Sequence, residues 1–115
     1  MNVVDFRPAR AAPITNFGSV LADRVRLADG QGEAHVYFLR IAAGGSIGRH
    51  PAGFDQLFLV VEGSGWAEGG DGRRVPLAAG QGAHFEKGEA HAKGSDAGLA
   101  AVMVQVERLR PSGEG

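Results

Sequence analysis

The stretch Gly44–Gly63 holds two side chains that could bind a ligand or take part in catalysis, His50 and Gln56. A neutral imidazole can hydrogen-bond or coordinate a metal ion, and an amide oxygen can accept a hydrogen bond or act as a weaker metal ligand. The chain has no cysteine, which excludes disulfides and thiolate ligands. Any metal ion would therefore be held by His, Gln, Asp or Glu side chains.

The sequence around Gln56 predicts how this residue is held. Leu57–Val61 is an unbroken apolar run that ends before Gly63, which is typical of a buried strand. Because side chains alternate along a strand, Gln56 shares one face with Phe58 and Val60. The opposite face is apolar too, so we expect the strand inside a sandwich or barrel. A polar Gln56 at the head of an inward row then needs a hydrogen-bond partner or a ligand.

The spacing of this stretch resembles the first motif of the cupin family, G-x5-H-x-H-x3,4-E-x6-G. Gly44, His50 and Gly63 match the motif, whereas Ala52 stands where the second histidine belongs and Gln56 where the glutamate belongs. Gly44 to Gly53 is glycine-rich and contains a proline, which predicts a sharply turning loop around His50.

The second cupin motif, G-x5-P-x-G-x2-H-x3-N, is matched in part further along the chain. Gly80, Gly88 and His91 agree with it, whereas Glu86 replaces the proline and Ser95 the asparagine. The two motifs together span residues 44–95. The resemblance implies an all-β fold, the double-stranded β-helix or jelly roll that is also called a cupin barrel.

The resemblance also implies a site. A metal-bearing cupin holds its ion with three histidines and a carboxylate inside the barrel, and by that pattern His50, Gln56 and His91 are the metal ligands here. A set without negative charge favours metals that bind imidazole well, such as Zn, Ni or Cu, and Mn or Fe stay open. The alternative is a neutral hydrogen-bonded cluster of the same three side chains. No organic cofactor is expected.

Two functions from different classes follow from this site. The first is a module that binds a small molecule, with or without a divalent metal ion. The second is a metal-dependent oxygenase or isomerase that uses the His/Gln/His site, and a closed, purely structural or regulatory cupin is a third reading. We expect the pocket to be lined by Ala52, Phe58, Val60, Phe85 and Val102.

Two other histidines have less specific surroundings. His35 is expected near the end of a strand with its ring tip in water, and His84 on the outer surface; the alternatives are that His35 points inward and that His84 is a further ligand. No serine stands in a nucleophile-elbow or triad context, and no glycine pair opens a helix for phosphate binding.

Length and composition limit the remaining possibilities. The 115 residues fit one domain, with a core over residues 18–106, an N-terminal arm over 1–17 and a disordered tail over 107–115. Strands that are apolar on both faces, together with the extended arm, suggest a homodimer. A net charge of -1 argues against nucleic acid, and no apolar run approaches a membrane span. We expect a cytoplasmic protein, and the abundant Arg, Ala and Gly are compatible with a bacterial genome.

Overall fold

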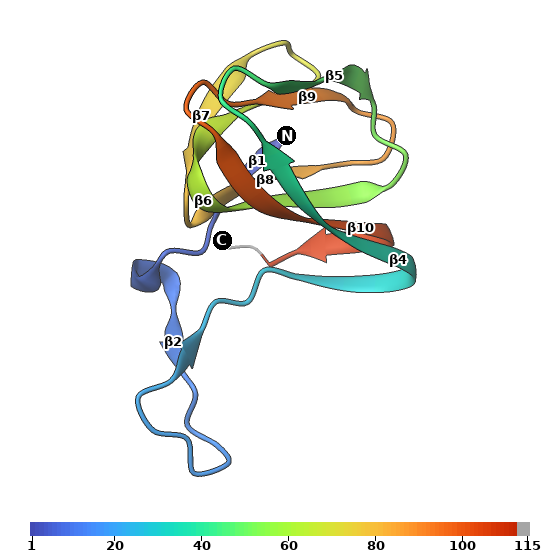
Figure 1. Ribbon diagram of the computed structural model, residues 1–115. Coiled ribbons are helices and arrows are strands. Elements are labelled where there is room, and N and C mark those ends of the chain that lie inside the picture. The colour runs from blue at the N-terminus through green and yellow to red at the C-terminus, as the bar shows by residue number, and fades with distance from the viewer. Residues whose placement is uncertain (113–115) are drawn as a thin grey trace.

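Strands joined by glycine-containing turns make up most of the computed structural model, which describes residues 1–112. One short 3-10 turn, η1 (Pro8–Arg10), interrupts them (Figure 1). The strands are β1 (Asn2–Asp5), β2 (Ala12–Pro13), β3 (Asp23–Arg24), β4 (Ala28–Ile41), β5 (Ser46–Pro51), β6 (Asp55–Glu68), β7 (Arg74–Ala78), β8 (Gln81–Phe85), β9 (Ala90–Gly94) and β10 (Leu99–Pro111). The all-β prediction is confirmed.

The long strand β6 joins the two layers of the fold. Its first half lies in a sheet of order β1-β8-β6-β10-β4, and its second half pairs with β7 and β9, with β5 at the far edge. A register shift against β10 between Ala100 and Ala101 marks the transition, and it leaves Val61 without a partner on β10. Such a bulge bends a strand, and this one turns β6 from one layer into the other.

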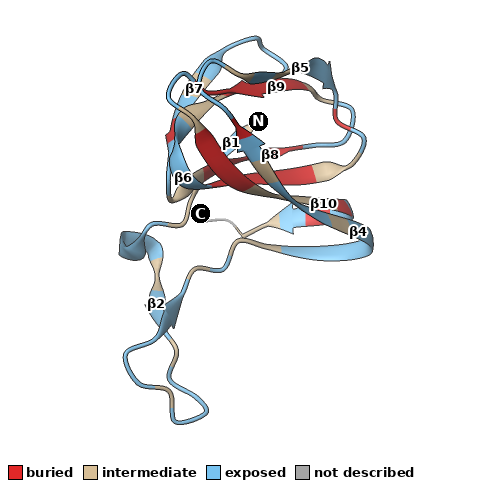
Figure 2. Cartoon of the chain, in the orientation of Figure 1, coloured by how far each residue is buried: buried red, intermediate tan, exposed pale blue. Residues whose placement is uncertain are grey.

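The main core lies between the two layers, as the buried segments in Figure 2 show. Phe58 and Val60 of β6 are fully buried there, and they pack with Phe85 of β8 and Ala101 of β10. These residues stand on one face of their strands because paired residues of antiparallel strands project to the same side. We call this face of the sheet the inner face.

A second apolar cluster covers part of the outer face of the same sheet. Leu57 and Leu59 of β6 are buried there with Val106 and Leu109 of β10. Val4 of β1 and Leu27 pack against this cluster, together with other partly buried side chains. The alternation predicted for Leu57–Val61 therefore holds as far as the bulge, with both faces of the strand in apolar surroundings.

The ends of the chain differ from the sequence-based prediction. Residues 107–111 are not disordered, because β10 continues to Pro111 and pairs with β4 as far as Ala28. Gly113 to Gly115 lie outside the described residues. The N-terminal arm is partly built into the fold, since β1 pairs with β8, and only the hairpin β2–β3 projects away from the barrel (Figure 1). Over residues 1–112, no helix is long and apolar enough to cross a membrane.

Candidate functional site

The inner face of β9 carries the most unusual pair of side chains in the core, His91 and Lys93. They lie two residues apart, so they point to the same side of the strand. His91 stands directly opposite His50 of β5, and Lys93 stands opposite Ala67 of β6, which belongs to the main core. Both side chains therefore enter the barrel, where His91 is 1% and Lys93 2% exposed.

His91 forms an aromatic group with its neighbours. Its ring centroid lies 4.6 Å from that of His50 and 4.6 Å from that of Phe85. Neither ring nitrogen of His91 has a hydrogen-bond partner among residues 1–112. Burial, with the positive charge of Lys93 and the neighbouring His50 adding to it, lowers the pKa of His91 to about 4. The ring is therefore neutral at pH 7, with one donor and one acceptor to offer.

Lys93 places an ammonium group in the apolar interior. The group donates a hydrogen bond to Oε1 of Gln56 and lies over the rings of Phe58 and Phe85, at 5.0 and 5.2 Å from their centroids. Burial lowers the pKa of Lys93 to about 8, so most molecules still carry the charge at pH 7. Gln56 thus has the hydrogen-bond partner that its inward position required.

The nearby carboxylates are bound elsewhere. Asp55 accepts hydrogen bonds from the backbone N–H groups of Lys87 and Leu109, each at 2.9 Å. Glu89 accepts from the Met1 amino group at 2.7 Å and from the backbone of the turn after β6. Among residues 1–112 no carboxylate forms an ion pair with Lys93, and this buried cation has only neutral partners.

A polar row connects this cluster with solvent. Gln105 of β10 stands opposite Gln56 on one side and opposite His35 of β4 on the other, so all three project from the inner face. Gln56 is buried, whereas Gln105 and His35 are partly exposed. Tyr37 lies next to His35 on the same face and is exposed. This polar row therefore runs along the inner face from the buried Gln56 to the partly exposed His35 on β4.

His35 contacts two neighbouring side chains, Glu33 and Phe54. The His35 Nε2 lies 2.6 Å from a carboxylate oxygen of Glu33, and the His35 ring meets that of Phe54 edge-on at 5.4 Å. His35 was expected near a strand end, but it lies in the middle of β4, with its side chain 39% exposed.

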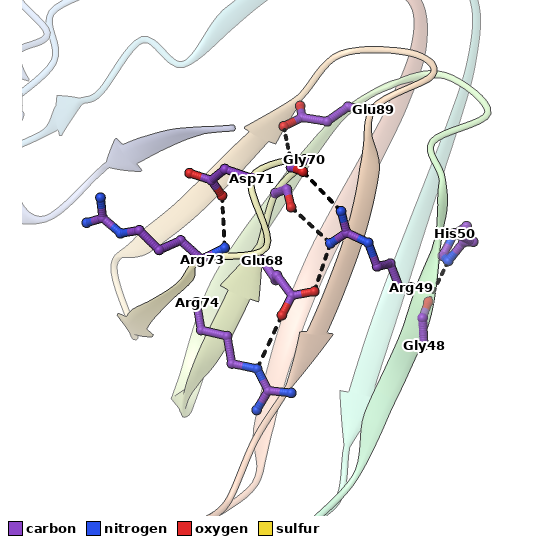
Figure 3. Close-up of polar contacts among 10 residues, drawn as sticks. Gly48, Arg49, His50, Glu68, Gly70, Asp71, Arg73, Arg74 and Glu89 are labelled. Carbon is purple, nitrogen blue, oxygen red and sulfur yellow. Dashed lines mark hydrogen bonds and ion pairs between the residues drawn. The ribbon is translucent and has the colours of Figure 1, made fainter.

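On the opposite wall, Arg49 of β5 braces the turn between β6 and β7 (Figure 3). Its guanidinium group donates to a carboxylate oxygen of Glu68 at 2.8 Å and to the carbonyl oxygens of Gly69 and Gly70 at 3.0 and 3.1 Å. The adjacent His50 is exposed and has its Nδ1 2.7 Å from the Gly48 carbonyl oxygen. Arg49 thus holds the strand that places His50 beside His91.

The residues present do not fit a divalent cation while Lys93 is protonated. The Gln56 oxygen, one of the three ligands expected from the sequence, already accepts a hydrogen bond from the ammonium group. A second positive charge at this short range would be repelled in a poorly solvated interior. Residues 1–112 also contain no group of three His, Asp or Glu side chains placed to hold a metal.

The residues predicted for the pocket take different positions. Phe58, Val60 and Phe85 lie in the main core, and Ala52 is buried beside the turn that precedes β9, where its backbone bonds to Gly88 and Glu89. The prediction that Val102 lines the interior is wrong, as the strand register shows.

Val102 stands opposite Leu59 and Phe38, and Leu59 belongs to the outer cluster. Val102 therefore faces away from the barrel interior. The reason is that an apolar run alone does not show which of its two faces points inward.

Lys93 and Gln105 were not predicted as site residues from the sequence. The signal for Lys93 was available, because a residue two positions after an inward histidine on a strand must also point inward. Gln105 interrupts an otherwise apolar strand, and only the register of β10 against β4 and β6 shows that it joins His35 to Gln56. His84 was expected at the surface, but it is 4% exposed beneath the N-terminal segment.

Two antiparallel layers linked by a bent strand, with polar side chains grouped in the interior, define the class of small jelly-roll barrels. The sequence pattern of the cupin domain matches residues 37–106, and the chain belongs to the cupin family. No curated protein is similar enough in sequence to be counted as a relative.

Solved structures share the fold at low sequence identity. A conserved protein of unknown function from Streptococcus pyogenes is similar with a TM-score of 0.62 and 20% identity, over 74% of this chain and 70% of that one. A cupin superfamily protein from Desulfitobacterium hafniense has a TM-score of 0.61 and 14% identity, over 71% and 77%. A predicted oxalate decarboxylase from Thermotoga maritima has a TM-score of 0.57 and 23% identity, over 62% and 64%.

Proposed function

We propose that this cupin binds a small organic acid in its barrel and that Lys93 receives the carboxylate of the ligand. The observation that carries the proposal is the buried Lys93 ammonium group, which has an amide and two aromatic rings around it but no carboxylate partner within residues 1–112. A buried charge is costly unless it is paired. A carboxylate ligand would supply the missing negative charge.

The surrounding groups suit the same ligand. The neutral His91 ring has a free N–H to offer to a second carboxylate oxygen, and Gln56 can turn its amide NH2 toward the ligand. The aromatic side chains of Phe54 and Tyr37, which lie beside His35, suit a ligand with an apolar or aromatic group. The ligand would therefore lie along the inner face, with its acid group innermost.

Benzoate and its neutral analogue benzamide provide a direct test by titration calorimetry at pH 7. We expect benzoate to bind at least roughly tenfold more tightly than benzamide, since a charge-assisted hydrogen bond contributes about that factor. Lys93→Met, which keeps length and removes charge, should abolish the preference. Lys87→Met is the matched control, because Lys87 is the other lysine of the chain and is exposed.

Equal affinity for the two probes, or unchanged benzoate binding by Lys93→Met, would contradict the proposal. Metal analysis of untagged protein tests the alternative of a metal-dependent oxygenase or isomerase at His50, Gln56 and His91. Near one equivalent of Zn, Ni, Cu, Mn or Fe would favour that alternative and would mean that Lys93 is neutral in the loaded protein.

A further inference from the structure

A cavity lies on the outer face of the sheet, on the opposite side from Lys93, and the proposed function does not use it. Its volume is about 800 Å³, which is within the usual range for ligand sites. The segment around Leu27 and the end of β10 at Pro111 and Ser112 form part of its walls, with β1 on another side. The backbone N–H of Ser112 donates to the Leu27 carbonyl oxygen at 3.0 Å, which joins two of these walls.

His84 contributes a buried polar group to this cavity. It stands on β8 opposite Asn2 of β1 and Leu57 of β6, so it projects from the outer face. The residue is 4% exposed, and neither ring nitrogen has a partner among residues 1–112. Burial lowers the pKa of His84, which keeps the ring neutral at pH 7 with one N–H to donate. A buried group of this kind requires a hydrogen-bond partner.

The charged residues around the cavity are mainly basic. Within residues 1–112, Arg10, Arg24 and Arg26 line it, and Asp5 is the only acidic residue that does. Asp5 is already bound by Arg7, and Arg10 lies 3.6 Å from it. Arg26 pairs with Asp29, whereas Arg24 has no ion pair within residues 1–112. A free guanidinium group is well suited to bind a carboxylate or a phosphate with two parallel hydrogen bonds.

The rest of the lining is apolar. Val4 and Leu27 line the cavity and also pack on the outer cluster formed by Leu57 and Leu59. An inorganic anion would leave these surfaces exposed to water, whereas a ligand with an apolar body would cover them. The cavity thus combines an anion-binding side with a hydrophobic side.

We propose that this cavity is a separate binding site for a small amphipathic oxyanion, in which Arg24 and His84 bind the anionic group and Val4 and Leu27 contact the apolar body. A phosphate monoester and a carboxylate share this chemistry. The site lies on the opposite face of the sheet from Lys93, so the two sites can be occupied independently.

The test uses 1-naphthyl phosphate, titrated into the full chain by calorimetry and by amide NMR, with neutral 1-naphthol as the charge control. Arg24→Gln and His84→Phe should each weaken binding roughly tenfold or more. Arg73→Gln is the matched control, because Arg73 is also an exposed arginine but lies in the turn after β6. Chemical shifts should change at β1 and β8.

Several results would overturn the proposal. These are equal binding of 1-naphthyl phosphate and 1-naphthol, equal loss in Arg24→Gln and Arg73→Gln, and shift changes confined to β9. Absence of binding at millimolar probe concentration would do the same. Arg24 is exposed, so Arg24→Gln should keep the fold. Its titration therefore tests the proposed site even if His84→Phe is unstable. Failure here leaves the benzoate test at Lys93 untouched.

Discussion

At the scale of single residues, burial of the Lys93 charge lowers the stability of the barrel. An apolar residue of similar size would pack in the same place without the loss of hydration that a charge suffers. The hydrogen bond to Gln56 and the rings of Phe58 and Phe85 offset part of this loss but bring no negative charge. A residue of this kind is expected where function requires a charge, and its cost can be measured.

The first prediction concerns the stability of Lys93→Met. The pKa of Lys93 falls from 10.5 to about 8 on folding, which corresponds to about 3 kcal/mol at pH 7. Below pH 8 both states are protonated and the full cost is present. Between pH 8 and 10.5 the unfolded chain binds more protons, so the free energy of unfolding of the parent rises with pH. The variant should be more stable by about this amount at pH 7, with the difference shrinking by pH 10.

Urea unfolding at both pH values, followed by Trp66 fluorescence, measures this difference. Lys87→Met serves as the control and should leave the pH dependence of the parent intact. If the free energies of unfolding of Lys93→Met and the parent differ by the same amount at pH 7 and pH 10, Lys93 does not titrate as described.

The second prediction concerns conversion to a metal site. Ala52→His with Gln56→Glu restores the ligand types of the family's first motif, but the introduced carboxylate would pair with Lys93. We therefore expect the double variant to gain little affinity for Zn²⁺. Adding Lys93→Ala should raise that affinity by roughly a hundredfold, because the competing cation is removed. Calorimetric titration with zinc and nickel measures the metal affinity of each variant. Equal affinities for the double and triple variants would contradict the role given to Lys93.

At the scale of elements, the site depends on strands from both layers. β6 supplies Gln56 from one layer, β9 supplies His91 and Lys93 from the other, and β5 adds His50 at the rim. Arg49 bonds to the carbonyl oxygens of the turn that follows β6, so β5 and β6 are held together near the rim (Figure 3).

The third prediction is that Arg49→Met loosens this end of the barrel. The change removes one exposed ion pair and two hydrogen bonds to backbone oxygens, and we expect a loss of about 1 kcal/mol in the free energy of unfolding. Hydrogen exchange should accelerate in the turn at Gly70 and Asp71. Arg73→Met, whose side chain lies outside the brace, should change neither quantity, and equal effects of the two variants would count against the brace.

Much of this fold could be predicted from local patterns. The alternation at Gln56, Phe58 and Val60 correctly places an inward row, and two spaced motifs identify the family. The position of Val102 and the end of β10 could not be predicted, because they depend on strand register and on contacts between distant segments. The inward position of Lys93 follows from its spacing to His91, but its hydrogen bond to Gln56 could not be predicted, since the two residues are 37 positions apart in sequence.

At the scale of the whole molecule, the outer face of the sheet is only partly covered. The N-terminal segment packs over Leu57 and Leu59, but Val36 and Phe38 of β4 are exposed on the same face, opposite Val104 and Val102. The projecting hairpin adds a second exposed apolar group at its tip, with Phe17 90% and Leu21 103% exposed. Both are positions that a second copy of the chain could cover.

The fourth prediction is a homodimer formed through the outer face of β4. Light scattering should give about twice the monomer mass of 11.9 kDa at micromolar concentration. Phe38→Glu places a charge in the centre of the proposed interface and should shift the protein to monomer, because an unpaired charge at an apolar contact costs several kcal/mol. Leu21→Lys separates the two possible modes of association. If the hairpin crosses to the partner, this variant is also monomeric, and if the faces alone pair, it remains a dimer. A parent protein that is monomeric over the whole range would refute the dimer, and a dimeric Phe38→Glu would refute this face.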